Sequence, residues 1–286
     1  LLVKMGRYLF HVTQLFKKDH KLFKVKDYIK SGNFFQLYKD KKSGIVWTFL
    51  DNNHNHNYYY LSENYIPHKQ RKGFFGLLYS FAQKIMFIYK LKNLKNHINK
   101  NKTVLDYGSG DGKFAEYLNK QHIKTMTYDP LVNKLDDSEV FLYQSLENQV
   151  DTLMMWHVLE HIPDLDSSIN AIYNSIKNKG CLVIAVPNIE SFDSKLYKGY
   201  WAGFDVPRHL YHFNHVSLIN FIEKQGFTFK YKKPLPFDSF FVSILSEKNR
   251  NNPFGILVGL IIGFISNFFA LFSTNYSSSF YVFTKN

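Results

Sequence analysis

A glycine-rich turn in the middle of the chain constrains the fold more than any other feature. Residues 103–107 form a short apolar run, and Gly108, Gly110 and Gly112 follow it in a G-x-G-x-G pattern. Apolar residues then recur at helical spacing in 114–118. This order predicts a buried parallel strand, a tight turn and the start of a helix. Because glycine lacks a Cβ and adopts positive φ, such a turn brings bare backbone close to a ligand.

A carboxylate follows the next predicted strand. Residues 123–128 form this strand, and Asp129 comes directly after it, on the order of 20 residues beyond the glycine turn. In α/β folds that bind nucleotides, an acidic residue at this place binds the ribose hydroxyls. The two features together predict a nucleotide-like ligand at the carboxyl ends of the first two strands.

Strand and helix patterns alternate from residue 103 to the end of the chain. This alternation is typical of an α/β protein with a parallel sheet and helices on both faces, in three layers. Gly180 is expected to end the helix 165–177. Before residue 103, two further strand-like stretches lie on either side of Gly44. The predicted strands are 34–38, 45–50, 103–107, 123–128, 140–143, 151–156, 181–186, 227–233 and 279–284, and the predicted helices are 112–120, 165–177 and 216–225.

The positive charge is concentrated in the first third of the chain. The net charge is +13, but residues 1–102 alone carry 20 Lys and Arg against 5 Asp and Glu. This asymmetry favours an anionic partner, although the codon bias of an AT-rich genome explains it equally. No recognition helix, zinc motif or aromatic–basic strand accompanies the charge, so nucleic acid is not expected as a partner. We divide this part into a basic N-terminal extension, 1–63, expected to be a truncated remnant, and a basic amphipathic helix, 64–102, that acts as a lid or rests on a membrane surface.

An apolar insert separates the last two predicted strands. Within the insert, residues 237–275, the stretch 253–272 carries no charge and is long enough to span a bilayer as a helix. Gly255, Gly259 and Gly263 are four residues apart, a spacing that permits close helix contacts. Three interpretations are open: a buried or oligomerising helix, which allows a homodimer; a membrane-inserted hairpin or interfacial helix; and a full span.

The sequence predicts no metal site. Cys181 is the single cysteine and lies in an apolar run, which is typical of a buried core residue. His54 and His56 lie in a polar loop without a third ligand at a suitable spacing. A disulfide framework and a cysteine-based zinc site are therefore excluded.

The third glycine distinguishes this turn from the dinucleotide fingerprint. In a G-x-G-x-x-G pattern the third glycine would stand at position 113, which is a lysine in this chain. The third glycine here comes one residue earlier, at Gly112. Five stretches follow one another in order: L-D-Y-G-S-G-D-G at 105–112, Y-D-P at 128–130, W-H-V-L-E-H-I-P-D at 156–164, V-P-N at 186–188 and P-R-H-L-Y-H-F at 207–213. With these stretches the chain, over residues 60–286, resembles the class I S-adenosylmethionine-dependent methyltransferases, in particular a bacterial subgroup that acts on small molecules or lipids. The resemblance implies a doubly wound, Rossmann-like sheet of seven strands whose last strand is antiparallel.

The resemblance also implies which residues bind S-adenosylmethionine. The backbone of the glycine turn would approach the methionine part, Asp106 would contact its ammonium, and Asp129 would bind both ribose hydroxyls. Leu146 would flank the adenine, although no acidic residue clearly matches the one that the family often has there to bind the adenine amine. The expected set is Asp106, Tyr107, Gly108, Ser109, Gly110, Gly112, Asp129, Pro130, Leu146 and His157.

Histidine is the side chain best suited to accept a proton from a hydroxyl acceptor near pH 7. For each candidate a structural role in the core or in an ion pair is the alternative. The candidate catalytic residues are His157, His161 and His209, with His212 as a further base, Arg208 to bind an acidic or phosphate-bearing acceptor, and Trp201 and Tyr200 to line its pocket.

The expected function is methyl transfer from S-adenosylmethionine to a small-molecule or lipid-linked acceptor, at oxygen. The basic helix 64–102 and the apolar stretch 253–272 favour a cytoplasmic protein that is peripheral on the inner face of a membrane. Two alternatives are a nicotinamide-dependent oxidoreductase, against which Lys113 argues, and a non-catalytic membrane-associated binding protein.

Overall fold

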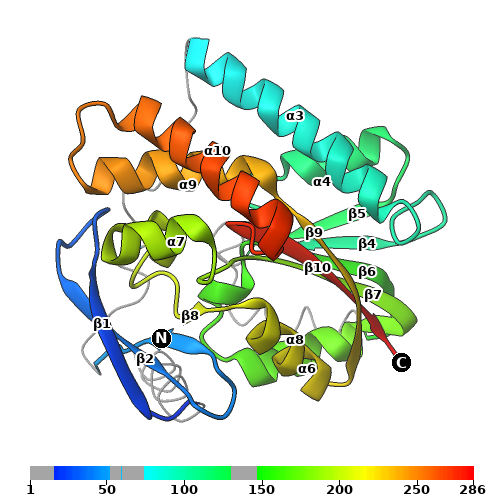
Figure 1. Cartoon of the computed structure of the whole chain (residues 1–286). Coiled ribbons are helices and arrows are strands. Elements are labelled where there is room, and N and C mark those ends of the chain that lie inside the picture. The colour runs from blue at the N-terminus through cyan, green and yellow to red at the C-terminus, as the bar shows by residue number, and fades with distance from the viewer. Residues whose placement is uncertain (1–15, 52–58, 60–73, 130–146) are drawn as a thin grey trace.

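The structure is a computed structural model that describes residues 16–51, 59, 74–129 and 147–286 (Figure 1). Its central sheet has six strands in the order β5-β4-β6-β7-β10-β9. β4 is parallel to β5 and β6, β6 is parallel to β7, and β10 is antiparallel to both of its neighbours. The doubly wound sheet with an antiparallel last strand is thus confirmed. The strands are β4 (Val104–Tyr107), β5 (Thr125–Tyr128), β6 (Val150–Trp156), β7 (Ile176–Pro187), β9 (Phe227–Pro234) and β10 (Ser278–Lys285).

The strand expected at 140–143 lies outside the described residues, so a seventh strand stays a prediction. The helices are α3 (Phe74–Leu94), α4 (Lys113–Lys120), α6 (Leu165–Ser175), α7 (Phe192–Tyr197), α8 (His215–Lys224), α9 (Pro236–Asn249) and α10 (Gly255–Ser273), with short 3-10 turns η2 (Leu159–His161), η3 (Lys198–Tyr200) and η4 (Ala202–Phe204). The predicted elements that fall on described residues agree with these bounds to within a few residues, with two exceptions: Gly180, and the basic helix expected to reach residue 102, which ends at Leu94.

Gly180 lies inside β7 and does not end a helix. The strand begins at Ile176, directly after α6, and its pairing with β6 shifts in register near this glycine. A Cβ at Gly180 would lie 2.7 Å from the carbonyl oxygen of Lys177 and 3.0 Å from that of Asp151. The glycine therefore permits a close approach of backbone segments at an irregularity of the sheet.

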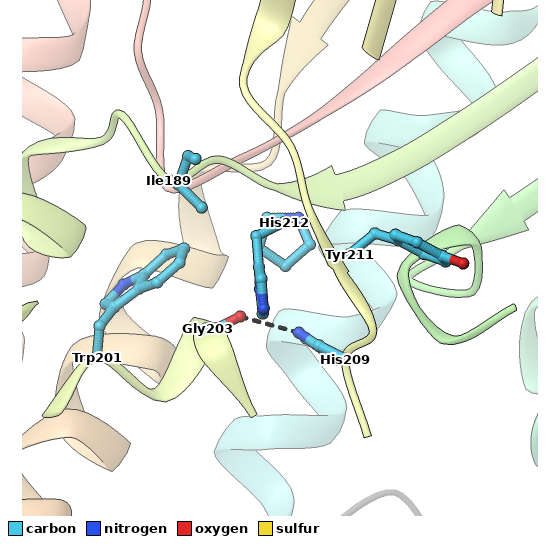
Figure 2. A pocket seen from close by; sticks show the side chains of 7 residues that line it. Ile189, Trp201, Gly203, His209, Tyr211 and His212 are labelled. Atoms are coloured by element: carbon cyan, nitrogen blue, oxygen red, sulfur yellow. Dashed lines mark hydrogen bonds between the residues drawn. The ribbon is translucent and has the colours of Figure 1, made fainter. Parts of the chain in front are cut away.

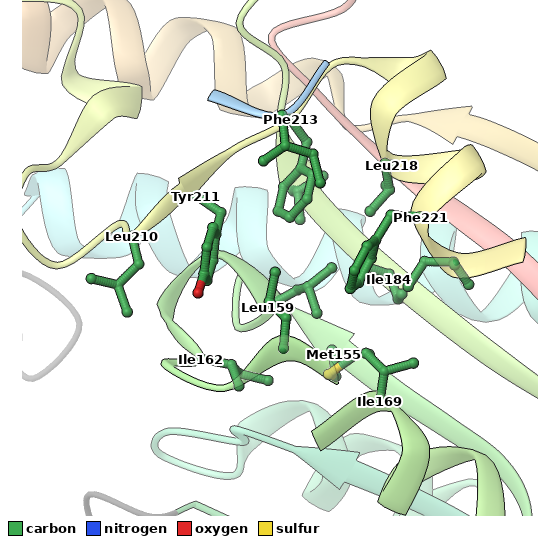
Figure 3. Packing of buried hydrophobic residues seen from close by; sticks show 14 of the residues in the cluster. Met155, Leu159, Ile162, Ile169, Ile184, Leu210, Tyr211, Phe213, Leu218 and Phe221 are labelled. Carbon is green, nitrogen blue, oxygen red and sulfur yellow. The ribbon is translucent and has the colours of Figure 1, made fainter. Parts of the chain in front are cut away.

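Side chains alternate between the two faces of the central sheet, which gives three layers. In β6, Leu153 and Met155 lie in the hydrophobic cluster that contains Ile169 of α6 and Phe221 of α8 (Figure 3). Met154, between them, lies in a second cluster with residues of α3 and α4. The strands are buried on both faces because helices cover both, which explains their continuous apolar sequences.

A second, smaller sheet joins the N-terminal segment to the loop after β7. It has the order β1-β2-β3-β8, and β3 pairs with β8 through Val46–His212 and Trp47–Tyr211. The strands expected on either side of Gly44 are β2 and β3. The members are β1 (His20–Lys26), β2 (Phe34–Lys39), β3 (Val46–Thr48) and β8 (Tyr211–His212).

The apolar insert forms a hairpin of two helices, α9 and α10, which pack against each other (Figure 1). The small residues of α10 face α9: a Cβ at Gly259 would lie 2.6 Å from Cα of Ile244, and one at Gly263 would lie 2.7 Å from Cα of Phe240. Within the described chain, α10 is the one helix long and apolar enough to cross a membrane, and 28% of its most apolar window is buried. The small-residue face thus serves a contact inside this chain.

Gly263→Ala is expected to destabilise the protein by about 1–3 kcal/mol, because the added methyl group meets backbone atoms of α9 that cannot move without separating the helices. Urea unfolding in detergent-free buffer measures this change. Leu257→Ala on the exposed side of α10 is the control, since Leu257 is 61% exposed and its truncation leaves no cavity. Equal stabilities of the two variants would contradict the tight α9–α10 contact.

Candidate active site

The glycine turn between β4 and α4 forms a shallow cradle. Gly108, Gly110 and Gly112 all have positive φ, at 72°, 56° and 70°. Gly108 lies against the sheet, because a Cβ there would be 2.3 Å from Cγ2 of Val158. Beside Gly110 and Gly112 no atom of the described residues lies within 4 Å of such a Cβ. The turn is therefore tight at its first glycine and open at the other two, as close approach of a ligand to the backbone requires.

Asp129 faces this turn from the end of β5. Its Oδ2 accepts a hydrogen bond of 2.8 Å from the backbone N–H of Gly110, and the N–H groups of Gly108 and Ser109 donate to the carbonyl of Tyr128. The neighbouring ring of Tyr107 is buried and lies against that of Tyr128. Pro130 and Leu146, also expected at the cofactor, lie outside the described residues. The structure thus brings the expected carboxylate and the glycine backbone together at one edge of the sheet.

Asp106 is buried at the end of β4, and its Oδ1 accepts no hydrogen bond from any residue that the structure describes. Burial raises the pKa of Asp106 to about 7; the charge of Lys90 opposes this change and that of Asp129 adds to it. Burial likewise lowers the pKa of Lys90, on α3, to about 8, against the charges of Asp106 and Asp238. The Lys90 ammonium lies 3.6 Å from the ring centroid of Trp156, within the range of a cation–π contact. The Lys90 ammonium thus interacts with the carboxylates of Asp106 and Asp238 and with the ring of Trp156.

Affinity for S-adenosylmethionine is expected to rise about tenfold from pH 6 to pH 8, because a contact with the cofactor's ammonium needs the ionised form of Asp106, whose pKa is about 7. Below this pKa the carboxyl group is protonated and the contact weakens as the pH falls. Calorimetric titrations across this range measure the effect. Asp106→Asn should bind more weakly and lose the pH dependence, and a flat profile in the unmodified protein would contradict the assignment.

His157 lies at the carboxyl end of β6 with a φ of 58°, a left-handed conformation that is uncommon outside glycine. Its Nε2 is 3.0 Å from Oδ2 of Asp238, on the first turn of α9, and its Nδ1 is 3.5 Å from Oε1 of Glu160. Burial opposes protonation, but the two carboxylates outweigh it and raise the pKa of His157 to about 10. His157 is therefore a cation at neutral pH and is poorly suited to act as a base there.

His161 and His209 lie against each other beside Glu160. Their ring centroids are 4.6 Å apart, and His209 Nε2 is 4.0 Å from Oε1 of Glu160. Burial and the neighbouring His209 lower the pKa of His161 to about 4, so this imidazole is neutral at pH 7. His212 has a different partner, because its Nε2 is 2.9 Å from Oγ1 of Thr48 in β3. Of the four candidate histidines, the structure brings His157, His161 and His209 around Glu160.

A small pocket opens beside His209 (Figure 2). Its empty space is about 160 Å³, and its lining includes the expected Trp201 but not Tyr200. Trp201 is buried and its Nε1 donates to Asp193, so it has both a structural and a lining role. The lining residues are Pro187, Ile189, Trp201, Gly203, His209, Tyr211 and His212.

Arg208 is buried and is not among the residues that line this pocket. Its guanidinium donates to Oδ1 of Asp27 at 3.0 Å and to Oδ1 of Asp205 at 2.6 Å. Asp27 lies directly after β1, so the ion pair joins the N-terminal sheet to the loop that carries the histidines. Two carboxylates hold its side chain, which agrees with the alternative of an ion pair; a role of Arg208 in binding an acceptor stays a prediction.

Three residues of the site were not among the expected ones: Lys90, Glu160 and Asp238. Asp238 had a signal in the sequence, since it is the single charged residue in the apolar run 237–245. Glu160 lies inside a stretch that matched the family and could have been found there. Lys90 had no local signal, because its role depends on how α3 packs against the sheet.

The comparisons with known proteins agree with this geometry. Residues 80–231, more than half of the chain, match the sequence profile of a family described as a methyltransferase domain. The chain therefore belongs to this methyltransferase family and is an S-adenosylmethionine-dependent enzyme. A search of curated protein sequences found no significant match.

Solved structures share the fold at low sequence identity. Phosphoethanolamine N-methyltransferase 2 of Haemonchus contortus, in complex with phosphomonomethylethanolamine and S-adenosylhomocysteine, is 15% identical with a TM-score of 0.50, over 100% of this chain and 74% of that one. An S-adenosylmethionine-dependent methyltransferase of Archaeoglobus fulgidus is 17% identical with a TM-score of 0.45, over 74% and 100%. These likenesses concern the fold.

The residues present suit the cofactor. The open side of the turn at Gly110 and Gly112 leaves room for a ligand against the backbone, and the buried Asp106 offers an oxygen without a hydrogen bond in the described chain. Asp129 is held toward the same turn. S-adenosylmethionine supplies a methyl group that its sulfonium already activates, so these residues have to bind and orient and need no redox chemistry.

Proposed function

We propose that this enzyme methylates an oxygen of a small or lipid-linked acceptor whose reacting end enters the pocket beside His209. The observation that carries the proposal is the cluster of Glu160, His161 and His209 next to that pocket. A hydroxyl has to lose its proton as the oxygen–methyl bond forms and the sulfur–methyl bond breaks, and this cluster can accept the proton. An amine acceptor would not need such a group to the same degree.

The pocket is closed around its lining side chains. The space beside Trp201 and His209 does not admit a water molecule, whereas ligand pockets commonly enclose about 300–1,000 Å³. The reacting end of an acceptor would therefore enter only after side chains of the lining move apart.

Transfer of a radiolabelled methyl group to hydroxylated small molecules and to lipid extracts tests this function. Mass spectrometry of the product identifies the methylated atom, and methylation at nitrogen or carbon would contradict the proposal. His209→Gln is expected to lower the rate by about 10²–10⁴-fold, the usual contribution of a proton acceptor. His122→Asn, which changes an exposed histidine after α4, is the matched control and should keep full activity.

The exposed side of the α9–α10 hairpin supports a location at a membrane. The large apolar side chains on the outer side of α10 are 44–77% exposed, and Phe81 and Ile88 of α3 are also exposed. Exposed lysines accompany them on α3 and after it, which suits an anionic lipid surface. Monomeric proteins in water rarely expose such apolar patches. The residues of α10 are Ile256, Leu257, Leu260, Ile261, Phe264, Phe268, Phe269, Leu271 and Phe272.

The hairpin also connects the apolar surface with the active site. Asp238, on the first turn of α9, contacts His157, and the same helix packs on α10. A hairpin lying in the lipid headgroup region would thus bring a lipid-linked acceptor toward the cofactor. We place the enzyme on the cytoplasmic face of a membrane, with the hairpin in its interface. A homodimer stays a prediction without a specific contact in its support.

Flotation with vesicles that contain anionic phospholipid tests this location. The double variant Leu260→Glu/Phe264→Glu is expected to lower vesicle binding by about 100-fold or more, because each apolar side chain is worth about 1.5–3 kcal/mol when buried. Val216→Glu is the matched control, since Val216 on α8 is 65% exposed and lies outside the hairpin. Recovery of the unmodified protein only in the soluble fraction would contradict the proposed location.

A further inference from the structure

Glu160, His161 and His209 form a compact set of metal-ligating side chains. One ligand atom from each lies within 4.8 Å of the other two, and all three residues are buried or partly buried. The set comes from two distant parts of the chain: η2 after β6 contributes two members, and the loop before β8 contributes the third. Two imidazoles and one carboxylate are a donor set that suits Zn²⁺ and other divalent ions of the first transition row.

Both imidazoles are oriented in the way that metal-binding histidines usually are. Nδ1 of His161 is 3.0 Å from the carbonyl oxygen of Arg208, and Nδ1 of His209 is 2.9 Å from that of Gly203 (Figure 2). A carbonyl can only accept a hydrogen bond, so each Nδ1 carries the proton and each Nε2 presents a lone pair. Histidines that bind a metal through one ring nitrogen usually donate a hydrogen bond from the other, and a backbone carbonyl is a common acceptor of that bond.

The buried carboxylate of Glu160 has an ion-pair partner but no close hydrogen bond. Its side chain is 1% exposed, and neither oxygen accepts a hydrogen bond from a residue that the structure describes. Nδ1 of His157 lies 3.5 Å from Oε1, but the closer contact of that histidine is with Asp238 at 3.0 Å. One distant cation offsets the cost of burial only in part, and a coordinated metal ion would offset more of it.

The geometry needs only a small adjustment to hold an ion. Ligand atoms around a tetrahedral Zn²⁺ lie about 2.0–2.1 Å from the metal and therefore ~3.4 Å from one another. The observed separations, up to 4.8 Å, would have to close by up to about 1.4 Å, through small shifts of the side chains. His209 also lines the pocket, so a fourth position would face the space where the acceptor is proposed to enter.

We propose that Glu160, His161 and His209 bind one divalent transition-metal ion, such as Zn²⁺, with a free coordination position toward the pocket. Binding of the ion does not depend on the proposed acceptor. Its role rests on the proposed function: with the ion bound, the two histidines would be ligands and no longer bases, and an acceptor hydroxyl coordinated at the free position would pass its proton to a solvent water more readily than an unbound hydroxyl does. The oxygen would then take the methyl group while the sulfur–methyl bond breaks.

Titration of the tag-free, chelator-treated protein with Co²⁺ tests the site without using activity. We expect one equivalent to bind and to give visible d–d absorption of a four- or five-coordinate ion, which added Zn²⁺ abolishes. His209→Ala and Glu160→Gln should each lower the affinity at least tenfold, while His122→Asn keeps it. Circular dichroism and calorimetry with S-adenosylmethionine show whether each variant is folded and binds the cofactor.

Two results would overturn the proposal: no stoichiometric Co²⁺ binding by the folded, cofactor-binding protein, or binding that the His209 and Glu160 variants leave unchanged. Metal binding without oxygen methylation would retain the site and reject the proposed acceptor chemistry. Oxygen methylation at full rate by a metal-free protein would reject the role of the ion in the reaction and retain the proposed function.

Discussion

Asp129→Ala is expected to weaken the binding of S-adenosylmethionine by about 100-fold or more. The resemblance assigns both ribose hydroxyls to this carboxylate, and a hydrogen bond to a charged group contributes about 1.5–3 kcal/mol. The structure directs the side chain toward the glycine turn through the N–H of Gly110. Isothermal titration calorimetry gives the dissociation constant directly.

S-adenosylhomocysteine should lose affinity for Asp129→Ala in parallel, because it shares the ribose and lacks only the methyl group. Asp111→Ala is the matched control: Asp111 lies in the same turn, is exposed and pairs with Lys113. This control should bind the cofactor as the unmodified protein does. If both alanine variants lose affinity to the same extent, the effect comes from the turn as a whole, and Asp129 does not have the assigned role.

The sequence was informative wherever structure depends on local chemistry. Gly108, Gly110 and Gly112 adopt the positive φ values that their spacing predicted, because only glycine takes such angles without strain. Strands buried on both faces have continuous apolar sequences, which is why the alternation of strands and helices predicted the sheet. Asp129 lies beside the turn because parallel strands end at the same edge.

Long-range pairing was not accessible in the same way. Nothing local to Tyr211 and His212 shows that they pair with β3, more than 160 residues earlier in the chain. The glycines of α10 predicted a close helix contact, but only the structure shows that the partner is α9 of the same chain. The metal-ligating set had the same difficulty, since Glu160 and His209 meet through folding and have no spacing motif.

Arg208 has a structural role in a buried ion pair, whatever its role toward an acceptor. Arg208→Met is expected to lower the free energy of unfolding by about 3–5 kcal/mol, because it leaves the carboxylates of Asp27 and Asp205 without their buried cation. Coulombic attraction and hydrogen bonds currently offset the burial of Asp27 and hold its pKa below the usual value. Urea unfolding at neutral pH measures the loss.

Two further variants test whether the buried ion pair itself accounts for this loss of stability. Arg208→Met/Asp27→Asn should recover part of the lost stability, since it removes one of the unpaired buried charges together with the arginine. Arg250→Met is the matched control, because Arg250 is partly exposed and lies 3.6 Å from Glu247, where loss of the pair costs about 1 kcal/mol or less. If Arg208→Met is as mild as Arg250→Met while turnover of an anionic acceptor is lost, the arginine binds the acceptor, and the ion pair is secondary.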